Sequence, residues 1–435
     1  MSGRVAVIGG GYAGFAAAVT LAANGRDVTV FEAARTLGGR ARRVEANGIT
    51  IDNGQHILLG AYSQTLALLR RVHGEGAERE LLERRRLRIE ASDGFRMVTP
   101  PLAAPWNLLA GLLFARGISF RDRLRTVEFV RRLDRDSFQC AVDMTAATLL
   151  EDQPQAVIDA LWEPLCIATL NTPIAVASAK IFLNVLAAAF ASRARDSNIL
   201  FPRVDLSTLF PDAAAAYVAD RGGEIRMGTT IAAVSTTDDC ILLTTGYHEE
   251  RFAAAVVAVG PHQLEALLES APAAAQVLAK VRAFTYEPIL TAYLQYGRAL
   301  PISQPMLKLD GSPGQWLIDR GQLAGPPGLA SVMISTEQAG TRKTHDVLAH
   351  AIDAQLRRSL PGLSAPSWMQ VISERRATYA CIAGLARPTA GILAARMYIA
   401  GDYTYGEFPA TLEAATRSGV AAARALLKES RQGAR

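Results

Sequence analysis

A glycine-rich turn near the N-terminus has the residue types and spacing that bind a diphosphate. Gly9, Gly11 and Gly14 satisfy the pattern G-x-G-x-x-G. In this pattern Gly9 allows the tight turn, Gly11 lets the backbone approach a pyrophosphate, and Gly14 permits close packing of helix on strand. We predict that Tyr12 and Ala13 also contact the dinucleotide, because a helix N-terminus attracts phosphate charge. The alternative is an alanine-rich helix after a turn that binds nothing.

The segments around this turn predict a βαβ unit. The apolar run Val5–Ile8 is typical of a strand, Phe15–Ala23 of a helix, and Asp27–Phe31 of a second strand. A strand before the glycines and a helix within them make the short motif specific. The first unit of the chain is therefore predicted to bind a dinucleotide at the carboxyl end of its first strand.

A carboxylate follows at the position where a nucleotide ribose would lie. Glu32 ends the second strand, 18 residues after Gly14. A carboxylate there accepts hydrogen bonds from ribose hydroxyls and disfavours a 2′-phosphate. We predict that Glu32 and its neighbour Ala33 belong to the binding site.

A second glycine pair indicates which dinucleotide is bound. The block from Glu32 through Gly38, Gly39 and Arg40 resembles the extended motif of the FAD-dependent amine oxidase and phytoene desaturase superfamily. The resemblance implies that these three residues approach the FAD diphosphate and the flavin, although a lone Gly-Gly-Arg is also found in ordinary turns. The chain has no second G-x-G-x-x-G, so no separate NADPH domain is predicted. The electron donor and the oligomeric state are left open.

The C-terminal segment Tyr398–Ala415 resembles the second FAD contact of the same superfamily. The resemblance implies that Gly401 and Asp402 contact FAD, with Asp402 hydrogen-bonded to the ribityl chain or a phosphate. The stretch Thr229–Val234 resembles the superfamily strand whose backbone, near Val234, reads the adenine.

A proline in this tail predicts where a helix begins. Pro409 suits a first helical turn, because its missing N–H costs nothing there. The free amides of Ala410, Thr411 and Leu412 are then expected to face the flavin pyrimidine carbonyl, where they would stabilise the negative charge of the reduced flavin.

Two stretches point to one group within the superfamily. Asp52–Tyr62 and Tyr403–Glu413 resemble the hydroxysqualene dehydroxylases of bacterial hopanoid synthesis. The resemblance implies that Asn53 and Gly54 pass the flavin and that the substrate is a long-chain isoprenoid. It also implies that an allylic hydroxyl leaves as water and that reduced FAD delivers hydride to give squalene. The alternatives are desaturation or oxidation of a carotenoid precursor, a porphyrinogen or an amine, and a prenyl-lipid escort protein without redox chemistry.

Four side chains are candidates for the proton donor that dehydroxylation needs. His56 titrates in a useful range, but it is equally well explained as a hydrogen-bonded structural residue. Tyr403, Tyr405 and Glu407 are acidic groups of the tail, with a polar loop as the alternative. Asp52 is expected to hold backbone or flavin and not to transfer a proton.

The order of patterns along the chain predicts an α/β protein of two interleaved domains. A Rossmann-like FAD-binding domain is expected from residues 1–80, 204–265 and 385–435. A mixed α+β substrate domain is expected from residues 81–203 and 266–384, and its first segment reads as mainly helical.

Composition limits the class of protein. The chain has 435 residues, 50% of them hydrophobic and 20% charged, so it can bury large cores. Its four cysteines are far apart, which predicts neither a disulfide framework nor a metal site. No apolar run reaches the roughly 20 residues of a spanning helix. The first residues leave no room for a signal peptide, so we expect a cytoplasmic protein.

Positive charge is concentrated in one segment. Arg79–Arg135 holds 13 arginines against 7 acidic residues, so its +6 exceeds the +5 of the whole chain. With the apolar run Trp106–Phe114 inside it, this segment predicts a peripheral contact with the membrane surface. Arginines on solvated helix faces are the alternative. We expect no nucleic-acid partner.

Overall fold

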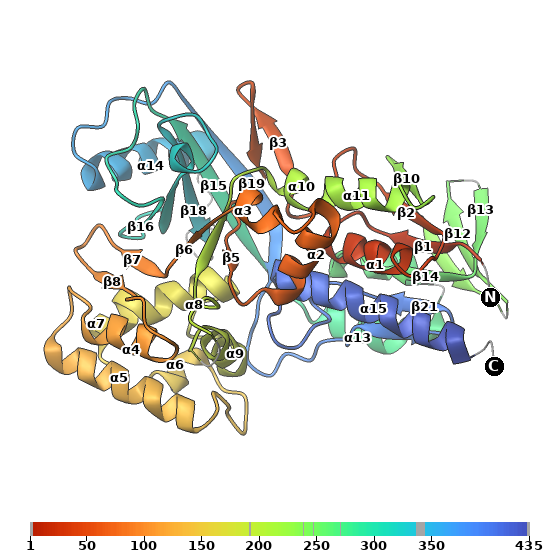
Figure 1. Ribbon diagram of the computed structural model, residues 1–435, viewed down its shortest axis with the longest axis horizontal. Helices are drawn as coiled ribbons and strands as arrows, with labels where there is room; N and C mark the ends of the chain where they lie inside the picture. The colour runs from red at the N-terminus through yellow and green to blue at the C-terminus, as the bar shows by residue number, and fades with distance from the viewer. Residues whose placement is uncertain are drawn as a thin grey trace.

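The computed structural model describes residues 3–190, 193–237, 239–246, 248–269, 271–335 and 344–432. The positions between and beyond these ranges, 336–343 of the predicted substrate domain among them, lie outside the described residues. Figure 1 shows an elongated molecule with both chain ends at one extremity.

A Rossmann-like sheet lies near the chain ends. Its strands, in sheet order, are β10 (Glu224–Met227), β2 (Val28–Glu32), β1 (Val5–Ile8), β14 (Ala254–Val257), β21 (Met397–Ile399) and β20 (Gly391–Ala394). All neighbours are parallel except β20 and β21. The strands come from three widely separated stretches of sequence, and the predicted α/β class is confirmed. The domain boundaries themselves stay a prediction.

Helices cover this sheet and bring the two ends of the chain together. Helix α1 (Tyr12–Ala22) is almost entirely buried and packs against α15 (Leu412–Gln432) and α11 (Pro211–Ala219). A side chain at Gly419 of α15 would collide with the carbonyl oxygen of Ala13. The glycine therefore permits the close approach of α1 and α15. An antiparallel three-stranded sheet lies beside them, formed by β11 (Ala233–Thr236), β12 (Ile241–Thr245) and β13 (His248–Phe252).

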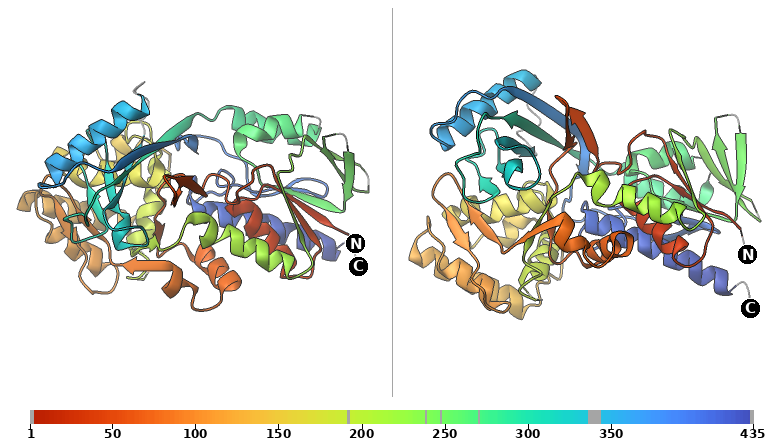
Figure 2. Two further views of the ribbon diagram at one scale, coloured as in Figure 1. Left: turned by 90° about the horizontal axis from the view of Figure 1, so that it is seen from above. Right: turned by 45° about the horizontal axis from the view of Figure 1, so that its top comes forward.

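A second, antiparallel sheet lies in the other half of the molecule, beside a helical module (Figure 2). Its order is β16 (Met306–Lys308), β17 (Trp316–Asp319), β18 (Leu329–Ser335), β15 (Tyr286–Gln295) and β19 (Trp368–Tyr379). Side chains alternate along β18, so Val332 and Ile334 pack with the apolar face of α14 (His345–Ser359), while Met333 and Ser335 face a cavity. One face of this sheet is thus structural and the other lines the site.

A helical module borders the same cavity. It includes α4 (Trp106–Leu113), α5 (Phe120–Arg135), the π-helical turn η1 (Ile158–Trp162), α8 (Glu163–Leu170) and α9 (Ala179–Phe190). Among the described residues, no helix is long and apolar enough to cross a membrane.

The mainly helical prediction for residues 81–203 was wrong at both ends of that segment. The structure has β6 (Leu82–Arg85), β7 (Arg88–Glu90), β8 (Arg96–Val98) and, at the end, β9 (Ile199–Pro202). In β7 and β8, Ile89 and Met97 are buried between charged or exposed neighbours, which is the two-residue period of a strand. The many arginines of this stretch hid that alternation.

Candidate flavin and substrate site

A cavity of about 920 Å³ lies between the carboxyl edge of the parallel sheet and the inner face of the antiparallel sheet. Most of the predicted cofactor residues line it. They are Gly9, Gly11, Tyr12, Ala13, Glu32, Ala33, Gly38, Gly39, Arg40, Asn53, Gly54, Gly401, Asp402, Ala410, Thr411 and Leu412. The structure thus brings together residues from both ends of the chain at one wall.

The glycines of the first turn create a cradle. Gly9 has φ +112°, and a Cβ there would lie 2.6 Å from the carbonyl oxygen of Ala258. Gly14 is not on the cavity wall; a Cβ there would strike the carbonyl oxygen of Gly9, in line with its predicted packing role. A Cβ at Gly11 would meet Gly38 only at 3.8 Å and would enter open space. The residues therefore fit a diphosphate that approaches the bare backbone at Gly11.

The carboxylate of Glu32 is held in place by backbone amides. One oxygen accepts a hydrogen bond from Gly10 N at 2.7 Å and the other from Ala34 N at 2.7 Å. The side chain lines the cavity at the end of β2. A carboxylate fixed in this way is positioned to accept from ribose hydroxyls with its remaining lone pairs.

An ion pair joins the N-terminal and C-terminal halves of the site. Arg40 Nη2 lies 2.5 Å from Asp402 Oδ1, and Arg40 Nη1 donates to the carbonyl oxygen of Ala377 at 3.0 Å. Burial disfavours the charge of Arg40, but Asp402 outweighs it, so the pKa of Arg40 is raised. The pair fixes both residues at the cavity wall and leaves the second oxygen of Asp402 for a polar partner.

The prediction for the start of the last helix needs a correction. Helix α15 begins at Leu412, so Pro409 precedes its first turn. Ala410 has φ +60°, and its N–H donates to the carbonyl oxygen of Asp402 at 3.3 Å. Thr411 caps the helix by accepting from Ala414 N at 3.1 Å. The amide of Ala410 is therefore not free, and the amides that open toward a ligand begin after it.

Val234 does not line the cavity. It is fully buried in β11, where it pairs with Leu243 in the apolar core. The strand begins only at Ala233, and the preceding turn, residues 229–232, borders the cavity instead. Of the stretch Thr229–Val234, residues 229–232 therefore border the cavity, and an adenine contact of the backbone near Val234 stays a prediction.

Three of the four proposed proton donors lie off the cavity wall. Tyr403 is buried and donates to the carbonyl oxygen of Val259 at 3.2 Å, and burial raises the pKa of its phenol. Arg417 Nη1 donates to Tyr405 at 3.1 Å and to Glu407 at 2.9 Å. These partners give each of the three side chains a structural role in the tail.

His56 lines the cavity. Its Nδ1 lies 3.0 Å from the carbonyl oxygen of Gly54, which leaves Nε2 as the second ring nitrogen for a ligand. Burial lowers the pKa of His56; the contact with Gly54 opposes this effect and Arg40 adds to it. A protonated His56 would therefore be a stronger acid than an ordinary imidazolium.

Asp52 holds backbone, as predicted. Its Oδ1 accepts from Leu206 N at 2.8 Å, and Tyr293 donates to its carbonyl oxygen at 3.0 Å. Burial raises the pKa of Asp52 to about 6, against the opposing charge of Arg320.

Sequence reasoning missed one acidic group and the whole apolar wall. Glu374 of β19 lines the cavity and accepts from Asn53 Nδ2 at 3.4 Å. Nothing in its local sequence distinguishes it from other charged strand residues. The apolar wall is built from several distant elements and includes Leu87, Ile89, Leu161, Leu165, Met306, Trp316 and Met333.

Comparison with known proteins agrees with this geometry. The profile described as flavin containing amine oxidoreductase matches residues 12–427. Hydroxysqualene dehydroxylase of Rhodopseudomonas palustris is 28% identical, with 99% of this chain and 100% of the relative covered, and that of Sinorhizobium fredii is 25% identical, with 99% of each covered. Zeta-carotene desaturase of Solanum lycopersicum is 24% identical over 56% of this chain and 44% of its own.

Solved structures show the same fold. Cyclohexylamine oxidase from Brevibacterium oxydans superposes with a TM-score of 0.74 at 16% identity, covering 99% of this chain and 100% of that chain. An oxidoreductase from Methanosarcina mazei gives a TM-score of 0.72 at 16% identity, covering 98% and 100%. With the glycine cradle and the Arg40–Asp402 pair, these matches identify an FAD-dependent oxidoreductase. The chain belongs to the family of flavin containing amine oxidoreductases.

Proposed function

We propose that this protein removes the allylic hydroxyl of hydroxysqualene reductively and yields squalene. The observation that carries the proposal is the two-sided cavity, in which an FAD cradle opens onto a wall of aliphatic and aromatic side chains. The relatives matched over their full length and named hydroxysqualene dehydroxylases support this substrate class.

The apolar wall accounts for the choice of an isoprenoid over a polar amine. Leu161 and Leu165 lie on one side, and Met306, Trp316 and Met333 lie on the other. Such a surface releases water when it binds a hydrocarbon chain, which favours an apolar substrate over a charged one.

When bound and reduced, FAD supplies a hydride for the allylic carbon. The chain's own task is to protonate the departing hydroxyl, so that it leaves as water. His56 fits this role because it is the one of the four proposed donors that lines the cavity, and its Nδ1 is already fixed by Gly54. Glu374, which also lines the cavity, is the alternative proton source.

The decisive experiment is a single turnover without oxygen. Photoreduced holoenzyme mixed with hydroxysqualene should form squalene at the rate at which the absorbance of oxidised flavin returns. Deuteride placed on the reduced flavin should appear in squalene if mixing is faster than exchange with water.

The same experiment separates the rivals. Oxidised enzyme that removes hydrogen from a carotenoid precursor would identify a desaturase, a reading that the partial match to zeta-carotene desaturase favours. Purified protein without flavin, but with bound prenyl lipid, would identify an escort protein. Either result would overturn the proposal.

A further inference from the structure

We propose that helices α4 and α5 form the surface by which this protein docks on an anionic lipid bilayer. Three large apolar side chains project there: Trp106 is 63% exposed, Phe114 74% and Phe120 63%. With the exposed Leu102 and Leu124 they form what we call the α4–α5 surface. Figure 1 places α5 along the outer edge of the molecule, at the end opposite both chain ends.

The exposed side chains are not the buried faces of these helices. Helix α4 already buries Leu108 and Leu112, and α5 already buries Phe129, Val130 and Leu133. The two helices pack against each other, and α5 packs against η1 through Phe129 and Trp162. The packing of these helices therefore does not require the exposed apolar side chains. Those side chains project where an ordinary surface helix carries polar residues.

The charge of the same surface fits anionic headgroups. Along the exposed side of α5 lie Arg121, Arg125, Arg131, Arg132 and Arg135, with the acidic Glu128 and Asp134 among them. Positions three and four residues apart share one face of a helix, so these arginines lie beside the two exposed apolar residues of α5, Phe120 and Leu124. Aromatic side chains that enter the interface beside arginines that hold headgroups are typical of peripheral membrane helices.

Side-chain contacts link this surface to the apolar wall of the cavity through η1. Phe129, on the buried side of α5, contacts Trp162 edge to face at 5.7 Å between ring centroids. Leu161, the neighbour of Trp162 on η1, lines the cavity. A bilayer against α5 would thus be separated from the cavity by two helical layers, α5 and the turn η1. This delivery route rests on the proposed function, whereas the docking surface does not.

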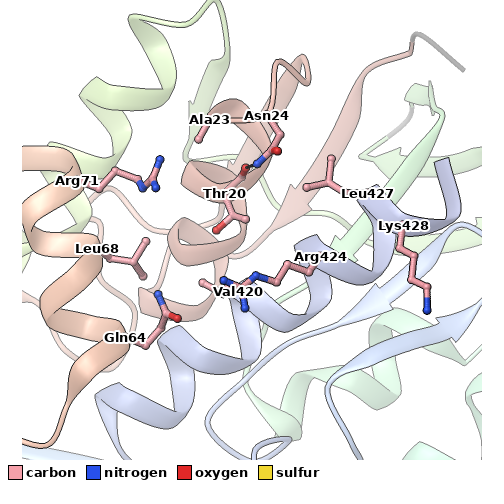
Figure 3. Close-up of a pocket in the computed structure, with 10 residues that line it drawn as sticks. All are labelled: Thr20, Ala23, Asn24, Gln64, Leu68, Arg71, Val420, Arg424, Leu427 and Lys428. Atoms are coloured by element: carbon pink, nitrogen blue, oxygen red, sulfur yellow. Dashed lines mark hydrogen bonds between the residues drawn. The ribbon is translucent and has the colours of Figure 1, made fainter. Parts of the chain in front are cut away.

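A second basic region provides the internal control. Figure 3 shows a groove between α1, α15 and α2 (Ser63–His73), in which Arg71, Arg424 and Lys428 carry positive charge. Of its large apolar side chains, Leu68 and Val420 are buried and Leu427 is half-buried. This groove, which we call the basic groove, has charge without protruding apolar groups and should not insert into lipid.

The test is sedimentation of the intact holoenzyme with vesicles, without substrate. Vesicles of phosphatidylglycerol and phosphatidylcholine should bind the protein, binding should fall with salt, and pure phosphatidylcholine should bind it far more weakly. The triple variant Arg121→Gln, Arg125→Gln and Arg131→Gln should lower the partition coefficient by roughly a hundredfold, because the contributions of the three arginines to attraction by an anionic surface add up. Arg71→Gln with Arg424→Gln, which removes charge from the basic groove, should change it by less than about threefold.

The apolar part of the surface has its own readout. Trp106→Ser with Phe114→Ser and Phe120→Ser should lower partitioning about tenfold or more, while Val347→Ser and Ile392→Ser, at exposed apolar positions elsewhere, should not. Trp106 fluorescence should shift to shorter wavelength on vesicles, and Trp106→Phe should abolish that shift. Retained flavin and retained turnover of detergent-dispersed hydroxysqualene would show that each variant is folded.

Several results would overturn the proposal. Equal binding of neutral and anionic vesicles, unchanged partitioning of both triple variants, or a change in oligomeric state without vesicle binding would each assign the surface to something other than an anionic membrane. Vesicle binding by an enzyme that cannot dehydroxylate hydroxysqualene would preserve the docking surface and reject only the proposed function.

Discussion

At the flavin end of the cavity the wall is made of bare backbone, two charged side chains in a pair and a fixed carboxylate, whereas at the far end it is made of aliphatic and aromatic side chains. At the flavin end, a displacement of a few tenths of an ångström weakens binding, because hydrogen bonds and close backbone contacts are short-ranged and directional. At the far end, binding depends mainly on area removed from water. Changes at the flavin end should therefore act on cofactor retention, and changes at the far end on substrate use.

The strongest test of this division is Gly11→Val. A branched side chain at Gly11 meets no protein atom closer than 3.8 Å at its Cβ, so the fold should survive while the space for the diphosphate is lost. We expect purified protein with essentially no flavin by absorbance and an unchanged far-UV circular dichroism spectrum. Gly297→Ala, at a glycine with no atom within 4 Å, is the control and should keep its flavin. Normal flavin content in Gly11→Val would reject the cradle.

His56 lies where the two walls meet, and His56→Gln should slow reoxidation of the reduced enzyme by hydroxysqualene about a hundredfold while flavin stays bound. Because only the protonated imidazole donates, the wild-type rate should fall as pH rises through a pKa that lies below the ordinary 6.5 of histidine. The variant should lose this pH dependence. A variant with the wild-type rate and profile would leave His56 a structural residue and move attention to Glu374.

Removal of the carboxylate from the charged pair should weaken the cofactor but not the substrate. Asp402→Ala deprives Arg40 of its partner and should raise the Kd of FAD roughly ten- to a hundredfold, whereas Asp402→Asn keeps an acceptor and should raise it less. Fluorescence titration of the apoprotein measures both. The same Kd for the two variants and the wild type would show that Asp402 only shapes the loop.

At the far wall, Leu165→Asn should leave flavin content unchanged and lower kcat/KM for hydroxysqualene about tenfold, since a polar amide there loses the free energy that a leucine gains when the substrate covers it. The comparable change Val347→Asn, at an exposed position of α14, should have no effect. Loss of flavin in Leu165→Asn would break the division between the two walls.

The smallest effect is expected outside both walls. Glu407 is largely exposed and paired with Arg417, so Glu407→Gln should change the rate of flavin reoxidation by less than about twofold. Tyr405→Phe should behave alike, because its hydroxyl accepts from the same guanidinium. A large loss of rate in either variant, with flavin retained, would mean that the tail moves to the cavity during turnover.

The flavin end could be predicted from the sequence because its requirements are local. A glycine that must admit a diphosphate, such as Gly11, and a carboxylate at the end of a strand, such as Glu32, are fixed by spacing within one βαβ unit. Prediction failed where the backbone departed from the simplest pattern. Ala410 adopts φ +60° and its N–H donates to Asp402, so the helix after Pro409 begins only at Leu412.

The far wall could not be predicted in the same way. Leu161, Met306 and Met333 come from three elements whose meeting depends on tertiary packing, and no spacing rule relates them. Glu374 is one charged residue on a long strand, and only the fold reveals that it faces the cavity. The fold class could be predicted from the order of strands and helices. Strands β6 to β8 were not predicted, because their many arginines obscure the alternation of buried and exposed residues.

The ion pair between Arg40 and Asp402 joins residues 362 positions apart in the chain. On a ribosome that adds about 5 to 20 residues per second, roughly 20 to 70 s pass between the emergence of the first half of the flavin site and that of the second. During that interval α1 lacks α15, the helix that covers it in the finished protein. The nascent chain must therefore shield an apolar helix before it can hold its cofactor, and FAD can lock the two halves of its site together only after α15 has left the ribosome.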